Sequence, residues 1–281
     1  MLKPFSSEPG FKQTESPNAT WKLGDGLSDT ELARQWKEEE QLGYTTLKTD
    51  EIEKPLLYRF LISAIVPRPI AFVSTLSGDG VPNLSPFSYF SMVSHNPPLC
   101  SVSFTLSPQK PKDTRENIKD TKQFVVSIIN EPFVEAANAT SIDAPPEIDE
   151  WIVSGLTPTP STLVKPPRVL ESALSLECEL YHFLDIPAIG GDAPANTMVL
   201  GHIRAIHVRN SVLTGPAEPG KPIEVDPTKF RAVSRLGGTT FARIGEGYSI
   251  PRPSWRQLEG EVRELIAKRE KEENPSGGSQ L

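Results

Sequence analysis

Short segments in which apolar and polar residues alternate, each bounded by proline or glycine, dominate the middle of this chain. The clearest is residues 99–106 (LCSVSFTL), where apolar side chains alternate strictly with serine and threonine. That period of two is typical of a β-strand with one buried face. Residues 174–184 alternate as well, and their pattern places Cys178 on the apolar face and Glu177 on the polar face. Further strands are expected at residues 69–76, 124–129 and 198–210.

The connections between these strands are short. The sequence SGDG after residue 76 predicts a β-hairpin in which glycine supplies the turn conformation. The 28 prolines favour many short elements joined by stiff loops. Brief helices are expected near Asp113, Pro132 and Glu147. Because strands outnumber helices and regular β-helix-β crossovers are missing from the pattern, we predict a mainly β fold with short helices, built as an antiparallel barrel.

Composition shifts divide the chain into three zones: an N-terminal extension over residues 1–50, a folded domain over 51–215, and a C-terminal zone over 216–281. In the first zone, Ser28 followed by Glu31 resembles a capping box and predicts a helix start. In the last zone, a helix is expected from about Ser254. Its apolar residues keep helical spacing and predict one buried face; they are Trp255, Leu258, Val262, Leu265 and Ile266.

The charge balance and the cysteines narrow the class of protein. A net charge of −7 disfavours a general affinity for nucleic acid or anionic membrane. Cys100 and Cys178 lie in apolar runs and are expected to be buried structural thiols, and the four histidines have no metal-ligand spacing.

No secretory leader or membrane span is visible, so a cytoplasmic protein is expected; the last three residues, Ser-Gln-Leu, only distantly resemble a peroxisomal address. The tail after residue 273 has the composition of a disordered segment.

A basic segment before a helix start could bind an anion. Residues 108–122 hold five cations against three acids, or +2, inside this acidic chain; the cations are Lys110, Lys112, Arg115, Lys119 and Lys122. Asp113 is a natural N-cap, so Thr114 would fall in the first turn, where free N–H groups and the helix dipole favour a phosphate. The alternative is an ordinary solvated helix.

A second segment could hold a flat ring. Residues 82–90 (PNLSPFSYF) set aromatic side chains beside Asn83, Ser85 and Ser88, and Ser74 and Thr75 end the preceding strand. Together with the basic helix start, these residues could hold flavin mononucleotide (FMN). The alternative here is a hairpin with a few surface hydroxyls.

These runs resemble a known family. RPIAFVST, GVPNLSPFSYF, NPPLCSVSF and KDTRENIKDTKQFVVSI, continued by SRLGGTTFARI, are similar in order and content to the flavin reductase-like family of FMN-binding split barrels, which includes flavoredoxins and proteins like nitrilotriacetate monooxygenase component B. The resemblance covers roughly residues 55–250. It implies a split barrel with helical extensions at both ends.

The resemblance also implies roles for individual residues. Lys112, Asp113 and Thr114 would bind the phosphate. Arg235, with Gly237 and Gly238, would close over the pocket, although a purely structural Arg235 is an equal alternative. The residues implied near the flavin ring and its ribityl chain are Ser74, Thr75, Asn83, Ser85, Pro86, Ser88, Phe90 and Ser103.

The activity implied is hydride transfer from NADH or NADPH to FMN, with no catalytic residue singled out. Family members are generally homodimers, and a monooxygenase could be a further partner. Two alternatives stay open: a flavin-dependent reductase of another small acceptor, and a split-barrel protein that binds flavin without turnover.

Overall fold

The computed structural model describes residues 3–8, 10–107, 112–145 and 147–273. Its contacts divide the chain into two compact units. The larger contains the described parts of Met1–Phe11 and Ile52–Gly245, and the smaller those of Lys12–Glu51 and Glu246–Leu281. Lys110 and the tail after residue 273, both singled out in the sequence, lie outside the described residues.

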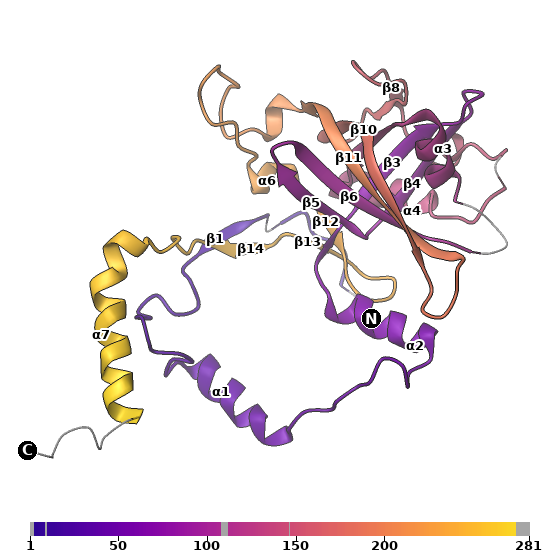
Figure 1. Ribbon diagram of the computed structural model, residues 1–281. Helices are drawn as coiled ribbons and strands as arrows, with labels where there is room; N and C mark the ends of the chain where they lie inside the picture. Colours follow the sequence, from indigo (N-terminus) through magenta and orange to yellow (C-terminus); the bar gives the residue numbers. More distant parts are fainter. Residues whose placement is uncertain (1–2, 9, 108–111, 146, 274–281) are drawn as a thin grey trace, which may run out of the picture. The chain divides into compact units, whose positions relative to one another are not determined.

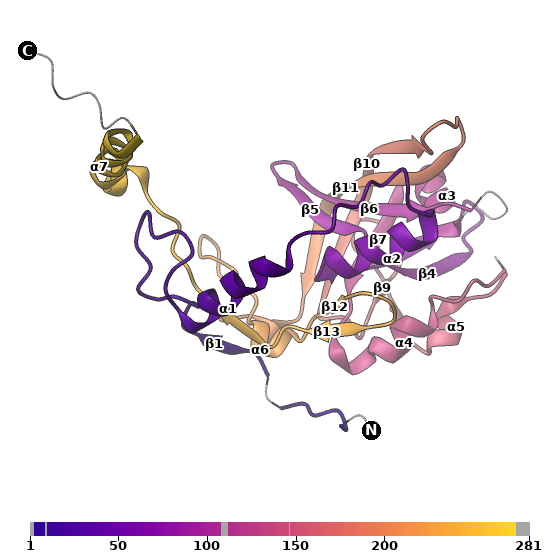
Figure 2. The ribbon, with the colours of Figure 1, turned by 90° about the horizontal axis from the view of Figure 1, so that it is seen from below.

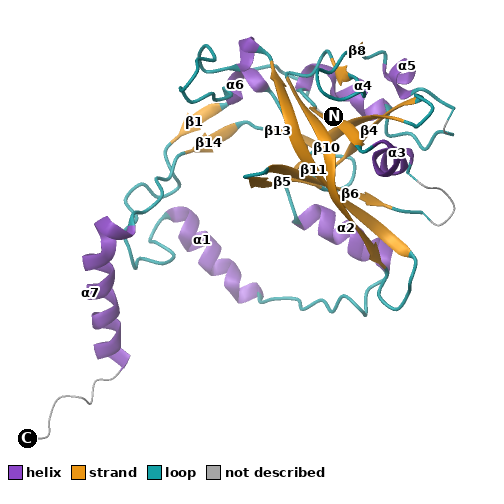
Figure 3. Cartoon of the chain, turned by 45° about the horizontal axis from the view of Figure 1, so that its top comes forward, coloured by secondary structure: helices purple, strands orange, loops and turns teal. Residues whose placement is uncertain are grey.

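The largest sheet belongs to the larger unit and is antiparallel throughout (Figures 1 and 3). Its strand order is β4-β3-β7-β10-β11-β6-β5. The strands are β3 (Ala71–Leu76), β4 (Pro82–Phe87), β5 (Phe90–His95), β6 (Pro98–Thr105), β7 (Gln123–Ile128), β10 (Leu174–Pro187) and β11 (Pro194–Val208). The strands expected from alternation are all present. The predicted hairpin is confirmed too: β3 pairs with β4, and Gly80 takes the left-handed conformation (φ 84°) in the turn between them.

The core of the sheet lies on one concave face. Strands from both halves of the sheet contribute fully buried apolar side chains to one cluster, which means that the sheet curls around it. On β6 these are Cys100, Val102 and Phe104, the face expected from the alternation. The sheet order ends at β4 and β5, and Phe87 of β4 packs edge-to-face on Phe104 of β6, with ring centroids 4.6 Å apart. The result is a barrel whose two edge strands are not paired with each other.

Strand β10 keeps the predicted alternation around Glu177 and loses it further along. Cys178 packs in the apolar cluster with Phe124, whereas Glu177 lies on the opposite face; both are fully buried, because a loop covers the face of Glu177. The register with β11 shifts between Glu177 and Cys178, and again between Leu180 and His182. Each irregularity adds a residue to one strand and breaks the period of two. Beyond the second shift Leu184, assigned to the apolar face, is exposed.

The opposite face of β3, β4 and β7 is covered by short helices. Phe72 and Leu84 pack there with Phe133 and Trp151 in a second buried cluster, and α4 and α5 lie next to each other (Figure 2). The helices are α1 (Glu31–Glu39), α2 (Lys54–Ala64), α3 (Asp113–Thr121), α4 (Val134–Ala139), α5 (Glu150–Ser154), α6 (Pro227–Phe230) and α7 (Trp255–Glu273), with 3-10 turns at Glu40–Leu42, Glu131–Phe133 and Asn210–Val212.

Smaller sheets complete the fold. In the larger unit, β12 (Val233–Arg235) lies between β13 (Phe241–Arg243) and β2 (Arg68–Pro69), and β8 (Pro158–Thr159) pairs with β9 (Arg168–Val169). Helix α2 was not expected from the sequence. It begins at Lys54 with a proline in its first turn and leads directly into β2.

The smaller unit joins the two ends of the chain, because β1 (Lys12–Thr14) pairs in parallel with β14 (Glu246–Tyr248). The N-cap of α1 is Thr30, whose hydroxyl accepts from the Ala33 N–H, and not Ser28 as predicted.

The expected buried face of α7 is only partly present: Leu258, Val262 and Leu265 are half-buried, whereas Trp255 and Ile266 are more than half exposed.

Both cysteines are buried, free thiols, as expected. None of the described helices combines the length and the apolar character needed to cross a bilayer.

Candidate functional site

Helix α3 begins where the sequence placed a possible phosphate site. The N-cap is Lys112, which makes no side-chain capping bond, and Asp113 is the first helical residue. The prediction that Asp113 is the N-cap was therefore wrong. Asp113 and Glu116 lie in the first turn, where the helix dipole stabilises acidic side chains. Thr114 follows and is 2% exposed. The helix start therefore carries one cation, Lys112, beside a buried hydroxyl.

The Thr114 hydroxyl belongs to a buried polar network with the β3–β4 hairpin. It donates to Oδ1 of Asn83 at 2.6 Å. The Thr75 hydroxyl, from the strand paired with Asn83, donates to the same oxygen at 3.4 Å and accepts from Nδ2 of Asn117 at 3.0 Å. Three of the predicted site residues, distant in sequence, are thus brought together.

Glu150 of α5 holds this network in place through Asn83 and the backbone of Leu84. One carboxylate oxygen accepts from Nδ2 of Asn83 at 3.3 Å and from the Leu84 N–H at 3.2 Å, which sets the orientation of the Asn83 amide. Burial, together with the charge of Asp113, raises the pKa of Glu150 although these bonds oppose the change. A cavity of about 240 Å³ opens here between Asp113, Asn117 and Glu150. Its acidic lining does not suit a phosphate.

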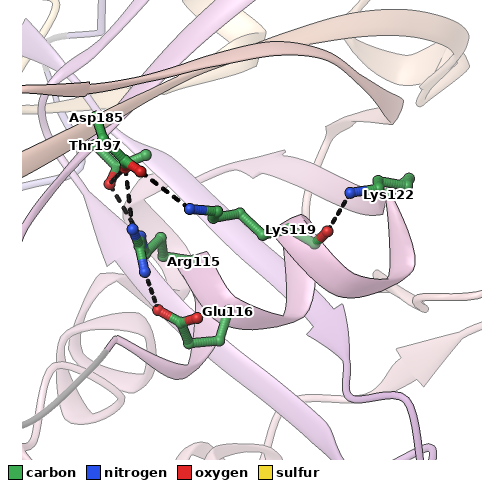
Figure 4. Close-up of polar contacts among 6 residues, drawn as sticks. All are labelled: Arg115, Glu116, Lys119, Lys122, Asp185 and Thr197. Carbon is green, nitrogen blue, oxygen red and sulfur yellow. Dashed lines mark hydrogen bonds and ion pairs between the residues drawn. The ribbon is translucent and has the colours of Figure 1, made fainter.

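The rest of α3 is anchored to the β10–β11 hairpin (Figure 4). Asp185 of β10 accepts from Arg115 at 3.0 Å, from Lys119 at 3.1 Å, and from the hydroxyl of Thr197. The Thr197 hydroxyl above all, then Arg115 and Lys119, lower the pKa of Asp185 to about 2 against the effect of burial. The ammonium of Lys122 turns back to the Lys119 carbonyl.

This anchoring revises the charge count over residues 108–122. Arg115 and Lys119 are matched by Asp185, and Lys122 folds onto its own helix end. Among the described cations of this segment, Lys112 is the one left for an anion at the helix start.

The remaining residues predicted on the first strands lie on two faces. Ser85 is opposite Val73 in the β3–β4 register and shares the barrel face with Thr75 and Asn83. Ser74 and Pro86 share the other face with Leu84 and Phe72, and the Ser74 hydroxyl donates to the Pro167 carbonyl. Ser103, on β6, is half-buried and opposite Met198. The predicted strand ends at Leu76, as β3 does, so alternation already places Ser74 and Thr75 on opposite faces; it was the family resemblance that implied both near the flavin.

A second group forms beyond the other end of β4. Ser88 and Phe90 line a cavity of about 440 Å³ together with Leu61, Ile62 and Ile65 of α2. At its base lies Arg68, 8% exposed, a residue that the sequence analysis missed. Its guanidinium donates to the carbonyls of Ile62, Ile65 and Leu236, and to the Ser88 hydroxyl.

The predicted residues of the SRLGG segment lie beside this group. Arg235 is the register partner of Arg68 and lies 4.4 Å above the ring of Phe241. A Cβ on Gly237 would meet Ser63 of α2 at 3.0 Å, so any side chain here would press against the helix. The segment is therefore held against α2 and Arg68.

The two groups lie at opposite ends of one strand. Asn83 of β4 and Ser88, the residue after the strand, are five residues apart, or about 17 Å at the usual rise of an extended chain. A helix start with a cation and a buried hydroxyl lies at one end, and an apolar, partly aromatic cavity at the other. An extended mononucleotide with a terminal phosphate and a flat ring has this distribution of charge and shape. The residues fit the flavin mononucleotide that the sequence resemblance implied.

Comparison with known proteins assigns the family. Residues 63–221 match the flavin reductase like domain. The chain belongs to this family. The match includes β3 to β11 and the start of α3, and it ends before the segment that holds Arg235.

Solved structures agree with this assignment. Nitrilotriacetate monooxygenase component B from Bacillus cereus is 32% identical, with a TM-score of 0.68 over 74% of this chain and 99% of the other. The 2-nitrobenzoate 2-nitroreductase NbaA from Pseudomonas fluorescens is 27% identical, with a TM-score of 0.65 over 75% and 98%. A Shewanella frigidimarina protein with a split barrel domain is 24% identical, with a TM-score of 0.60 over 75% and 99%. The predicted split barrel is confirmed.

Proposed function

We propose that this flavin reductase-like protein binds FMN along β4 and is an NAD(P)H-dependent flavin reductase. The observation that carries the proposal is the network joining Thr114, Asn83 and Thr75 at the start of α3, with an apolar cavity at the far end of the same strand. Family membership supports flavin as the ligand.

Each group of residues has a part in binding. Lys112 and the first turn of α3 attract the phosphate, and Thr114 offers it a hydroxyl. Because Asn83 also accepts from Thr75, the Thr114 hydroxyl can turn to the phosphate while the Asn83 oxygen keeps a partner. Phe90 and the apolar wall of α2 keep water from one side of the ring. The bound flavin supplies the redox chemistry, so the chain needs no acid–base pair of its own.

Two of the similar solved structures favour more specific forms of the proposed function. A monooxygenase component B suggests that a monooxygenase takes up the reduced flavin. A 2-nitrobenzoate nitroreductase favours the second candidate, in which bound flavin reduces a small aromatic acceptor. The homodimer and the cytoplasmic location expected from the sequence remain predictions.

Titration with FMN and riboflavin tests the phosphate site, since riboflavin has the same ring without the phosphate. We expect Thr114→Val to weaken FMN binding about tenfold, since one charge-assisted hydrogen bond is lost, and to leave riboflavin binding unchanged. Thr121→Val, at the other end of α3, is the matched control. Equal losses for both ligands would place the phosphate elsewhere.

The flavin spectrum tests the activity. We expect wild-type protein with FMN to lose its absorbance near 450 nm when NADH or NADPH is added without oxygen, in line with flavin chemistry. Bleaching of a stoichiometrically bound flavin that is reoxidised by 2-nitrobenzoate would favour the second candidate. Absence of any flavin binding would refute both.

A further inference from the structure

Two guanidinium groups face each other across β2 and β12. Arg235 and Arg68 are register partners in this antiparallel pair. In the part of the chain that the structure describes, no aspartate or glutamate oxygen lies within the 4.0 Å of an ion pair from either one. Like charges at opposed positions of a sheet are destabilising, and a buried charge ordinarily has an acidic partner. This conflict calls for an explanation.

Arg68 is occupied by the fold. Four of its hydrogen bonds tie the C-terminal turn of α2, the end of β12 and the residue after β4 together. Within the described ranges, the partners of its positive charge are carbonyl and hydroxyl dipoles.

Arg235 is much less constrained. Among the described residues its side chain makes one hydrogen bond, from Nη2 to the Gly238 carbonyl at 2.7 Å, and its guanidinium lies over the Phe241 ring. Partial burial, and then the charge of Arg68, lower its pKa, which means that its surroundings disfavour the cation as they stand. Its remaining N–H groups and its charge are available to an anion.

The neighbouring cavity has the opposite character. Apolar residues of α2 and the aromatic rings of Tyr89 and Phe90 form most of its lining. Tyr58 of α2 lies close enough to interact electrostatically with both Arg235 and Tyr89. Arg68 lines this cavity, and Arg235 lies next to Arg68 without lining the cavity itself. Two cations next to an apolar cavity suit a flat ring joined to an anionic group.

We propose that Arg235 binds the anionic group of the second ligand of the reaction, a molecule in which a flat ring is joined to a phosphate or a carboxylate, and that Arg68 reinforces it through its charge. The inference rests on the proposed function, in which flavin is the first ligand. In the proposed function the flavin phosphate binds at the start of α3, at the other end of β4 from Ser88, the residue whose hydroxyl contacts Arg68, so it does not supply this anion. Either the phosphates of a dinucleotide donor or the carboxylate of an aromatic acceptor has the required chemistry.

The test removes the charge of Arg235 and compares ligands with and without an anionic group. Arg235→Gln is assayed with NADH and with 1-benzyl-1,4-dihydronicotinamide, a neutral donor of the same ring chemistry, and with benzoate and benzamide as inhibitors. We expect the KM for NADH or the inhibition constant of benzoate to rise about tenfold. The KM for the neutral donor or the inhibition constant of benzamide should not change, and kcat should not change either.

Two variants control the experiment. Arg235→Lys keeps the charge and should retain most of the affinity. Arg243→Gln removes the same charge from β13, where Arg243 pairs with Glu131, and should leave the ligand preference unchanged. A change with NADH identifies dinucleotide phosphates as the source of the anion, and a change with benzoate identifies an acceptor carboxylate.

The inference is overturned if Arg235→Gln affects charged and neutral ligands equally, or affects neither. Weaker FMN binding with no change in ligand preference would overturn it too, because Arg235 would then serve the flavin. FMN titration of the wild type separates this result from failure of the proposed function. If FMN does not bind, calorimetry with NADH and benzoate on the flavin-free wild type and Arg235→Gln still tests the role of Arg235.

Discussion

At the scale of single residues, Glu177 illustrates why alternation alone does not show whether a polar face is exposed or covered. Its carboxylate is fully buried and accepts from the backbone N–H groups of Thr162, Leu163 and Val164, and it contacts the His207 ring. Those partners come from a loop and from β11. A pattern of apolar and polar letters places Glu177 on the face opposite Cys178 but contains no sign of these partners.

We expect Glu177→Gln to lower the free energy of unfolding by about 3 kcal/mol, because three backbone N–H groups lose a charged acceptor. Burial raises the pKa of Glu177, but the Thr162 and Leu163 N–H groups and His207 outweigh it, so the net change is downward. A lowered pKa stabilises the fold above the unfolded value of about 4.3 and loses that effect as pH falls.

Urea unfolding of both proteins at pH 7 and pH 3 measures this effect, and the difference between them should shrink at pH 3. Glu179→Gln is the control, since Glu179 lies on the same strand in a half-exposed ion pair with Arg204 that should contribute no more than about 1 kcal/mol. An equal loss for both variants would contradict the assignment.

At the scale of elements, the sequence predicted α3 and its place in the site but not what holds it. The charged residues between positions 112 and 121 suggested a helix whose cations face a ligand. Arg115 and Lys119 instead bind Asp185, about 70 residues further along the chain. In the same way the sequence placed Thr75, Asn83 and Thr114 near one ligand, while Asn117 and Glu150, which orient them, went unnoticed. Local composition predicts where a helix starts. It does not predict the partners that come from distant elements, because the curled sheet brings these residues together.

The anchoring of α3 can be tested with Asp185→Asn. We expect stability to fall by about 1–3 kcal/mol, since two charge-assisted bonds are weakened, and amide hydrogen exchange in α3 to accelerate more than in β7. Because the folded-state pKa of Asp185 is lowered to about 2, its contribution is complete above the unfolded value of about 3.9 and disappears as pH falls towards 2.

Glu116→Gln is the matched control, since Glu116 contacts the same Arg115 from a more exposed position. It should change exchange in α3 much less than Asp185→Asn. If the two variants behave alike, Asp185 does not hold the helix.

At the scale of the whole molecule, the sequence treated the two ends of the chain as separate extensions, and the parallel pairing of β1 with β14 joins them. No short-range signal predicts a three-residue pairing across more than 230 positions. The buried apolar residues are distributed unequally between the units. Ala33 is the one in the described part of the smaller unit, and the others lie between Ile62 and Val233.

This distribution predicts that residues 52–245 fold without the smaller unit. Both apolar clusters and every residue of the proposed flavin and anion sites lie within this range. The segment also loses residues 3–11, whose described contacts with it include Phe5 and Ser6 on Arg243, a small part of its packing. We therefore expect a cooperative thermal transition and an FMN dissociation constant within about threefold of that of the full chain. A chain that aggregates, or that binds FMN more than tenfold more weakly, would mean that the ends contribute to the barrel or to the site itself.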